Sequence, residues 1–256
     1  MMSSMKGIAV RSLVLVLCLA LVVACVPVNQ SADGLTAEAH SQLGYSYLQE
    51  GNDTKALKEF LEAVKLAPAD AESRAGLAQA YHRKKAYQLA EEQYLKAIEI
   101  DGDNPQYHNN IAALYLDMRR WDDAVRHFRL AADNLLFDRP AVARAGMAAA
   151  LIQKGDYIAA IESGKKALID DYQLPQAHYF LGEAYSGIER YDEAVASYQR
   201  AIELAPNYLL AHYSLGKAFL KLKQNEQARR ELEKVIELAP RSEQARMARD
   251  YLQLID

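Results

Sequence analysis

Residues 175–208 read PQAHYFLGEAYSGIERYDEAVASYQRAIELAPNY, and residues 209–242 read LLAHYSLGKAFLKLKQNEQARRELEKVIELAPRS. Each stretch is 34 residues long, and both place Ala-His-Tyr, Leu-Gly and Ile-Glu-Leu-Ala-Pro at the same distances from the start. The same frame continues backwards over four more units: 141–174, 105–138, 71–104 and 37–70. Only the insertion of Arg139 and Pro140 interrupts it. A constant period of this length is typical of stacked helical hairpins.

Small residues recur at two positions of the frame. The eighth position holds Gly44, Ala78, Ala112, Ala148, Gly182 and Gly216, and the twentieth holds Ala56, Ala90, Ala124, Ala160, Ala194 and Ala228. Positions 7, 8 and 11 share one face of a first helix, and positions 20, 24 and 27 share one face of a second. The small residues therefore let two helices approach closely. Position 24 is large in every unit except the fourth, where Gly164 stands.

These columns resemble the tetratricopeptide repeat, and the resemblance covers 37–242. It implies an all-α fold, a right-handed superhelical solenoid of six repeats whose first helices line a concave side. An open stack needs a polar cap at its end. Residues 243–256 carry Ala245, Ala248 and Leu252 at helical spacing, with charged residues between them, and are expected to form this capping helix.

The amino terminus has the features of a secretory signal. Residues 1–24 contain Lys6 and Arg11, followed by an apolar run that is short for a membrane span. The run ends in Val-Val-Ala before Cys25, which resembles the bacterial lipobox. That resemblance implies cleavage before Cys25 and acylation of this cysteine, with 25–36 as a tether. An ordinary signal peptide followed by an incidental cysteine is the alternative.

Two further observations concern location. Cys18 and Cys25 are the only cysteines, so cleavage leaves no disulfide in the mature chain. By resemblance to sorted lipoproteins, Val26 is not the aspartate that retains a protein in the inner membrane. We therefore expect an outer-membrane lipid anchor with the repeats facing the periplasm.

Composition and motifs argue against catalysis and nucleic-acid binding. The formal net charge is −4, and both signs are mixed along every repeat, so no basic stripe is present. No phosphate-binding glycine loop, nucleophile elbow or cysteine pair occurs. Four histidines occupy position 4 of their repeats, namely His40, His108, His178 and His212. Equivalent positions lie about one hairpin apart, too far to share an ion at ~2.1 Å. We expect no enzyme activity, no metal, no cofactor and no small-molecule substrate.

Function is then expected on the concave side. In tetratricopeptide proteins positions 2, 5, 9, 12 and 13 of the first helix point into the groove. This resemblance predicts a protein-binding groove formed by Tyr45, Leu48, Gln79, His82, Asn109, Ala113, Leu116, Ile152, Tyr179 and Tyr213. Aromatic, aliphatic and amide side chains suit an extended or helical protein segment with apolar anchors. Some of these side chains could instead pack against the next repeat.

A closer resemblance links the chain to the type IV pilus pilotins, the PilF, PilW and Tgl lipoprotein family. It rests on the lipobox, the tether, the six repeats, the stretch from Asn109 to Tyr115, Arg120-Trp121 and the irregular junction that ends at Pro140. It implies an outer-membrane secretin subunit as partner, and a role in secretin localisation and multimer assembly. The alternative is an adaptor for cell-wall hydrolases or for another outer-membrane assembly or secretion complex.

Overall fold

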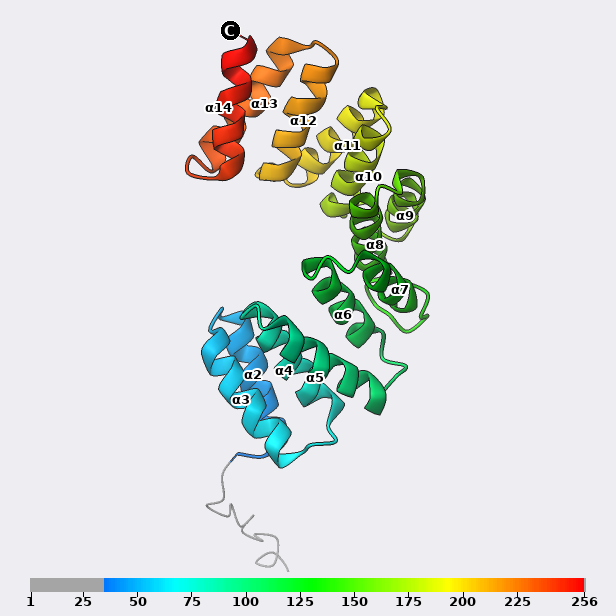
Figure 1. The fold of residues 1–256 in the computed structure, drawn as a ribbon, viewed down its shortest axis with the longest axis vertical. Helices are drawn as coiled ribbons and strands as arrows, with labels where there is room; N and C mark the ends of the chain where they lie inside the picture. Colours follow the sequence, from blue (N-terminus) through cyan, green and yellow to red (C-terminus); the bar gives the residue numbers. More distant parts are fainter. Residues whose placement is uncertain (1–34, 256) are drawn as a thin grey trace, which may run out of the picture. The chain divides into compact units, whose positions relative to one another are not determined.

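The computed structural model describes residues 35–255 (Figure 1). The predicted signal peptide, the lipidation site Cys25 and the tether as far as residue 34 lie outside the described residues. Between residues 35 and 255 the chain forms only α-helices and turns. The helices are α2 (Ala37–Gln49), α3 (Asp53–Leu66), α4 (Ala71–Arg83), α5 (Tyr87–Ile100), α6 (Pro105–Asp117), α7 (Trp121–Ala132), α8 (Pro140–Lys154), α9 (Tyr157–Asp170), α10 (Pro175–Gly187), α11 (Tyr191–Leu204), α12 (Leu209–Lys221), α13 (Asn225–Leu238) and α14 (Glu243–Ile255).

Each of the six 34-residue units holds two helices, and α14 follows the last of them. The predicted all-α solenoid is therefore confirmed. Helix α8 begins at Pro140, one residue before the predicted fourth unit, because proline is favoured in the first turn of a helix. No helix in the described part of the chain is both long enough and apolar enough to cross a bilayer.

Stacking along the chain sets which helices face inward. Every helix packs only on helices one or two places away in chain order, within residues 35–255. The first helices of adjacent repeats, such as α2 and α4 or α8 and α10, touch one another. The second helices of adjacent repeats, α3 and α5 for example, make no such contact in this described region. First helices therefore gather on the inner side of the stack, and second helices spread apart on the outer side.

A large side chain at position 24 packs against small residues of two repeats. Phe60 is fully buried, and a Cβ added at Gly44 would lie 2.8 Å from its ring. A Cβ at Gly76, in the next repeat, would lie 2.1 Å from the same ring. Phe128 meets Gly146 in the same way, with 2.5 Å to an added Cβ. Gly76 and Gly146, both at position 6, therefore leave the space that the phenylalanine ring of the preceding repeat occupies.

Polar side chains at position 4 join a repeat to its own second helix, to the preceding repeat, or to both. His212 Nδ1 lies 2.7 Å from Glu231 Oε2, and His212 Nε2 lies 2.9 Å from the carbonyl oxygen of Pro206. Glu231 stands at position 23 of its repeat, and Pro206 at position 32 of the repeat before. Bonds to one or both of these positions are also made by His40, Arg74, His108 and His178. The histidine column therefore serves as a set of hydrogen-bonded links between helices.

The turn inside each hairpin uses the left-handed backbone region. Gly51 and Gly155 have φ of +77° and +78° at position 15 of their repeats. The other four repeats place non-glycine residues there with φ between 58° and 62°: Lys85, Arg119, Glu189 and Lys223. This left-handed conformation is strained for non-glycine residues, and its use at the four charged positions emerges only from the structure.

We expect two glycine substitutions to have opposite effects on stability. In Gly182→Ala the added Cβ would lie 2.6 Å from the Tyr198 ring, so overpacking should lower the free energy of unfolding by about 1–3 kcal/mol. In Gly164→Ala the added Cβ would meet Leu181 at an ordinary 3.5 Å, so improved helix propensity should raise it by about 0.5–1 kcal/mol. Urea unfolding followed by circular dichroism measures both, and destabilisation of equal size in the two variants would contradict the packing described above.

Candidate protein-binding surface

Six of the ten residues predicted for the groove meet in two hollows on the inner helices. Tyr45, Gln79 and Asn109 come together on α2, α4 and α6. Leu116, Ile152 and Tyr179 come together on α6, α8 and α10. Each hollow therefore draws on the first helices of three consecutive repeats, because these helices touch one another along the stack.

The first hollow, here the amide hollow, has a polar lining. It is lined by Tyr45, Glu72, Ala75, Gln79, Gln106, Tyr107, Asn109, Asn110 and Arg139. Gln106 Nε2 donates to Asn110 Oδ1 at 2.7 Å, and Arg139 Nη2 donates to Gln106 Oε1 at 2.6 Å. Asn109 Oδ1 is buried without a hydrogen-bond partner among the described residues. An N–H group from a bound segment would satisfy this acceptor.

The second hollow, here the aromatic hollow, is more apolar and measures about 270 Å³. It is lined by Leu116, Asp117, Trp121, Ala149, Ile152, Gln153, Tyr179, Phe180 and Glu183. The Tyr179 ring lies 5.2 Å from that of Phe180 and 5.1 Å from that of Tyr208, measured between centroids. Leu116 and Ile152 also pack against the buried core, which holds them in place.

A carboxylate lies among the tyrosines of this region. Tyr198 donates its hydroxyl to Glu183 Oε1 at 2.5 Å. Burial first, and the Glu183 charge second, raises the pKa of Tyr179 and of Tyr198. The same two causes raise the pKa of Tyr208 to about 12. All three rings therefore stay neutral hydrogen-bonding groups at physiological pH.

The other four predicted groove residues lie elsewhere. His82 is partly exposed, and its Nε2 lies 2.8 Å from Asp117 Oδ2, at the edge of the aromatic hollow. Ala113 is partly buried against the core. Leu48 and Tyr213 correct the prediction, because they are only 5% and 8% exposed and belong to the packing between neighbouring helices. Neither side chain lines either hollow.

The groove prediction named six of the residues that line the two hollows, and two of those it missed, Trp121 and Arg139, do not belong to first helices. Trp121 begins the second helix of its repeat, and Arg139 belongs to the insertion that interrupts the period. A rule based on first-helix positions cannot select either. The signals available were the single tryptophan of the chain and the insertion itself.

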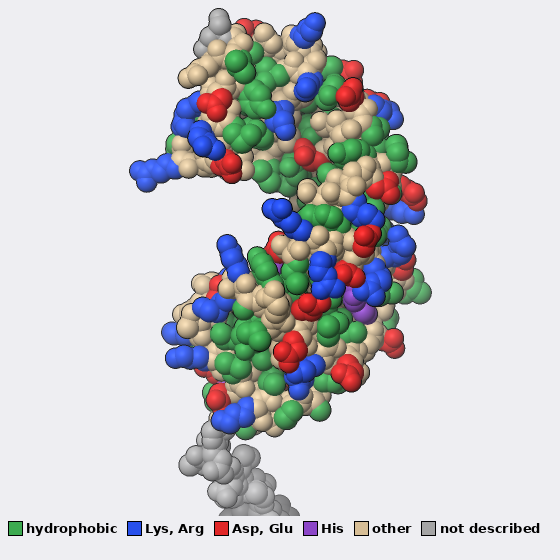
Figure 2. Space-filling model, viewed as in Figure 1, with side chains coloured by type: hydrophobic (Ala, Val, Ile, Leu, Met, Phe, Trp, Pro, Cys, Tyr) green, Lys and Arg blue, Asp and Glu red, His purple; other side chains and the backbone are tan. Residues whose placement is uncertain are grey.

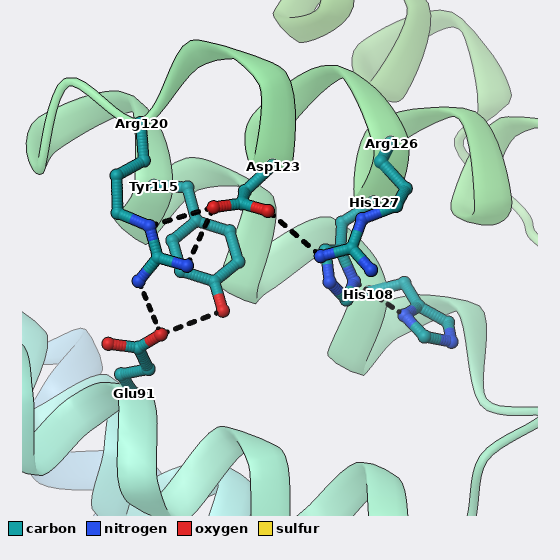
Figure 3. Close-up of polar contacts among 7 residues, drawn as sticks. All are labelled: Glu91, His108, Tyr115, Arg120, Asp123, Arg126 and His127. Carbon is teal, nitrogen blue, oxygen red and sulfur yellow. Dashed lines mark hydrogen bonds and ion pairs between the residues drawn. The ribbon is translucent and has the colours of Figure 1, made fainter.

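A polar network joins repeats two and three (Figure 3). Glu91 on α5 accepts from the Tyr115 hydroxyl at 3.0 Å and from Arg120 Nη1 at 2.5 Å. Arg120 Nε in turn donates to Asp123 Oδ2 at 2.8 Å, and its guanidinium lies 4.3 Å from the centre of the Tyr115 ring. One carboxylate of the second repeat thus positions both an aromatic ring and a guanidinium of the third.

A histidine pair lies beside this network (Figure 3). His108 Nδ1 and His127 Nδ1 are 2.9 Å apart, and His108 Nε2 donates to the Gly102 carbonyl oxygen at 3.1 Å. With Nε2 protonated, neutral His108 has a bare Nδ1, so His127 Nδ1 must be the donor. The two nitrogens are thus joined by a hydrogen bond, and no group of three metal-ligating side chains occurs within the described residues.

Charge is mixed over the surface rather than gathered. On the face shown in Figure 2, basic and acidic side chains alternate between apolar ones, and no large area of that face carries a single sign. Nucleic-acid-binding surfaces instead concentrate lysine and arginine.

Comparison with known families agrees with the helical pattern. Models described as tetratricopeptide repeat match residues 32–105, 93–126 and 209–242, and a model described as TPR repeat matches 188–223.

The chain is a tetratricopeptide-repeat protein.

Pilus proteins are among the known proteins similar to this tetratricopeptide-repeat chain. The type IV pilus assembly protein PilF of Pseudomonas aeruginosa is 30% identical over 100 residues, which cover 39% of this chain and 40% of the relative. The solved structure of Pseudomonas aeruginosa PilF has a TM-score of 0.72 and 20% identity, covering 84% of this chain and 97% of that one. PilW, described as a widely conserved type IV pilus biogenesis factor, has a TM-score of 0.76 and 18% identity, covering 87% and 99%.

The similarity to the two solved structures shows a shared fold and no more, because the sequence identities are only 20% and 18%. The sequence match to PilF spans well under half of either protein. The tetratricopeptide-repeat fold generally provides scaffolds for protein interaction, and the two hollows on the inner helices are consistent with that role.

We expect the histidine pair to make this repeat protein sensitive to acid. Burial, and then the neighbouring His108, lowers the pKa of His127 to about 4, whereas an unfolded histidine titrates near 6.5. Arg126 and Arg120 lower it further, and Asp123 opposes them. Unfolding therefore takes up a proton at His127 as pH falls below about 6.5. The free energy of unfolding should fall by up to about 1.4 kcal/mol per pH unit between pH 6.5 and pH 4 because of this proton.

The matched variant for this prediction is His127→Asn, whose Nδ2 can still donate to His108. The stability advantage of the wild type over the variant should shrink between pH 7 and pH 4, as measured by urea unfolding at each pH. His212, whose pKa is raised because the bonds to Glu231 and to the Pro206 carbonyl outweigh burial, is present in both proteins and cancels. Parallel pH profiles of wild type and variant would show that His127 does not titrate in this way.

Proposed function

We propose that this protein is a lipid-anchored, periplasm-facing outer-membrane scaffold that binds a secretin subunit and promotes its localisation and multimer assembly, as a type IV pilus pilotin. The observation that carries the proposal is the pair of hollows, each lined by the inner helices of three consecutive repeats. The similarity to a type IV pilus assembly protein supports the choice of a pilus system. The Val-Val-Ala sequence before Cys25 supports the lipid anchor.

Binding, rather than catalysis, would provide the effect. The sequence has no phosphate-binding glycine loop, so we propose no nucleotide-driven step. A scaffold tethered to the membrane confines its partner to that membrane and raises the local concentration of subunits there. Assembly of a multimer depends steeply on that concentration, so a modest binding affinity is sufficient for a large effect on assembly.

Leu116, which lines the aromatic hollow, offers a direct test of this function. In Leu116→Asp a carboxylate replaces a side chain that lines the hollow, so secretin should remain largely monomeric. Deletion of the gene should have the same result. The matched control is Leu130→Asp, since Leu130 is 49% exposed on the second helix of the same repeat and lies outside both hollows.

The measurement is the ratio of multimeric to monomeric secretin in membranes, alongside circular dichroism of each purified variant. Because Leu116 also touches the core, only a variant with normal helicity and unfolding midpoint is informative about binding. Normal secretin multimers in the deletion strain would remove the proposed function.

The lipid anchor is tested separately at Cys25. Mass spectrometry of the membrane-extracted protein should show an acylated amino-terminal Cys25, and Cys25→Ser should release the protein from the membrane fraction. Cys18→Ser is the matched control, since Cys18 falls within the segment removed by cleavage at Cys25. A mature protein that begins at another residue would be evidence against lipidation at this site.

A further inference from the structure

The aromatic hollow combines an apolar floor with an acidic edge. Leu116, Ile152 and Phe180 contribute apolar surface, and the rings of Trp121 and Tyr179 add flat aromatic faces. Asp117 and Glu183 contribute two carboxyl groups, and none of the nine lining residues is basic. The amide hollow differs, because its lining includes the basic Arg139 as well as the acidic Glu72.

Neighbouring side chains hold both carboxyl groups of the aromatic hollow in position. Asp117 is oriented by His82 at 2.8 Å, and Glu183 by the Tyr198 hydroxyl at 2.5 Å. The Asp117 side chain is still 57% exposed, so its charge is accessible from solvent. Oriented acceptors at the mouth of an apolar hollow favour a ligand that is apolar at its centre and positively charged next to it.

The size of the hollow limits what can occupy it. A volume of about 270 Å³ lies below the usual range of 300–1,000 Å³ for pockets that enclose drug-sized ligands. The volume of the hollow suits one large apolar side chain of a bound protein better, with the adjacent residue of that protein lying over the acidic edge. Lysine and arginine fit that neighbouring place, because their methylene stems pack on apolar surface while the charge reaches a carboxylate. The faces of Trp121 and Tyr179 can also attract a cation.

We propose that the aromatic hollow receives an apolar side chain of a partner protein whose adjacent residue is a lysine or an arginine. This inference rests on the proposed function in that the occupant is a protein segment. It goes further by stating the chemistry that selects the segment, with Asp117 and Glu183 as specificity-determining residues. The same protein segment with acidic neighbours should be rejected, because like charges would face one another across the edge.

Trp121 allows a direct measurement on the intact repeat protein. It is the only tryptophan of the chain and it lines the hollow, so its fluorescence reports occupancy. The probes are short synthetic peptides in a glycine-serine background with a central leucine. The leucine is flanked by two lysines, by two serines or by two glutamates. A fourth peptide keeps the lysines and replaces the leucine with serine.

The lysine peptide should give a saturable change in Trp121 emission. Relative to it, the serine-flanked peptide should bind about two- to tenfold more weakly, as expected for loss of partly exposed ion pairs. The glutamate peptide should bind more weakly still. Loss of the leucine should weaken binding roughly tenfold or more, because its burial supplies the apolar contact.

Isosteric variants then test the two carboxylates. Asp117→Asn and Glu183→Gln keep an oxygen that can accept from His82 and from Tyr198, so the fold is expected to persist. Their combination should abolish the preference for the lysine peptide over the serine-flanked peptide while leaving binding of the latter within about twofold. Glu162→Gln is the matched control, since Glu162 pairs with Lys166 at 2.7 Å on α9 and lies outside the hollow.

Several outcomes would overturn the inference. These are equal binding of the lysine and glutamate peptides, no saturable change with any peptide, and a lysine preference that survives the double variant. Dependence of secretin multimers on the gene, together with any of these outcomes, would leave the proposed function standing and remove only the occupant. Selective binding of the lysine peptide, together with normal secretin multimers in the deletion strain, would support the inferred occupant and remove the proposed function.

Discussion

Close contact between paired helices, as where the Phe60 ring lies against Gly44 and Gly76, is the constraint on which the rest of the structure depends. A ring at position 24 fills the space between its own first helix and that of the next repeat, so one side chain joins two hairpins. Interiors packed to this density leave no room for an added methyl group. The inner helices are consequently held against one another, and their remaining faces form a continuous surface on which binding residues from different repeats can meet.

Polar links at position 4 complement this apolar contact. The His212 ring reaches Glu231 in its own second helix and the Pro206 carbonyl in the preceding repeat. A planar ring with two nitrogens can bridge two partners on opposite sides, and an arginine such as Arg74 can do the same with its guanidinium. Because the accepting carbonyls belong to the turns between repeats, these links join adjacent hairpins. Histidines that could suggest a metal site are thereby accounted for by the architecture.

Departures from strict repetition distinguish the two hollows. The insertion before α8 brings Arg139 to Gln106 and adds a positive charge to the amide hollow. The aromatic hollow, formed farther along the stack, receives Asp117 and Glu183 without any basic lining residue. A perfectly periodic stack would present equivalent chemistry at each step. Here the inserted Arg139 balances the Glu72 charge in one hollow, and substitutions along the first helices make the other hollow apolar and acidic.

The sequence by itself determined the helices, their pairing and the all-α solenoid, because a 34-residue period with small residues at positions 8 and 20 admits few other packings. Through the resemblance to tetratricopeptide proteins, it also pointed to six groove residues that meet in two hollows. Only the tertiary structure decided that Leu48 and Tyr213 are buried, that Trp121 joins the surface from a second helix, and that Arg139 reaches the amide hollow. The physical reason is that the repeat period determines only the direction of a side chain within its own repeat. How far the next repeat covers that side chain depends on the packing between repeats, which residues distant in sequence determine together.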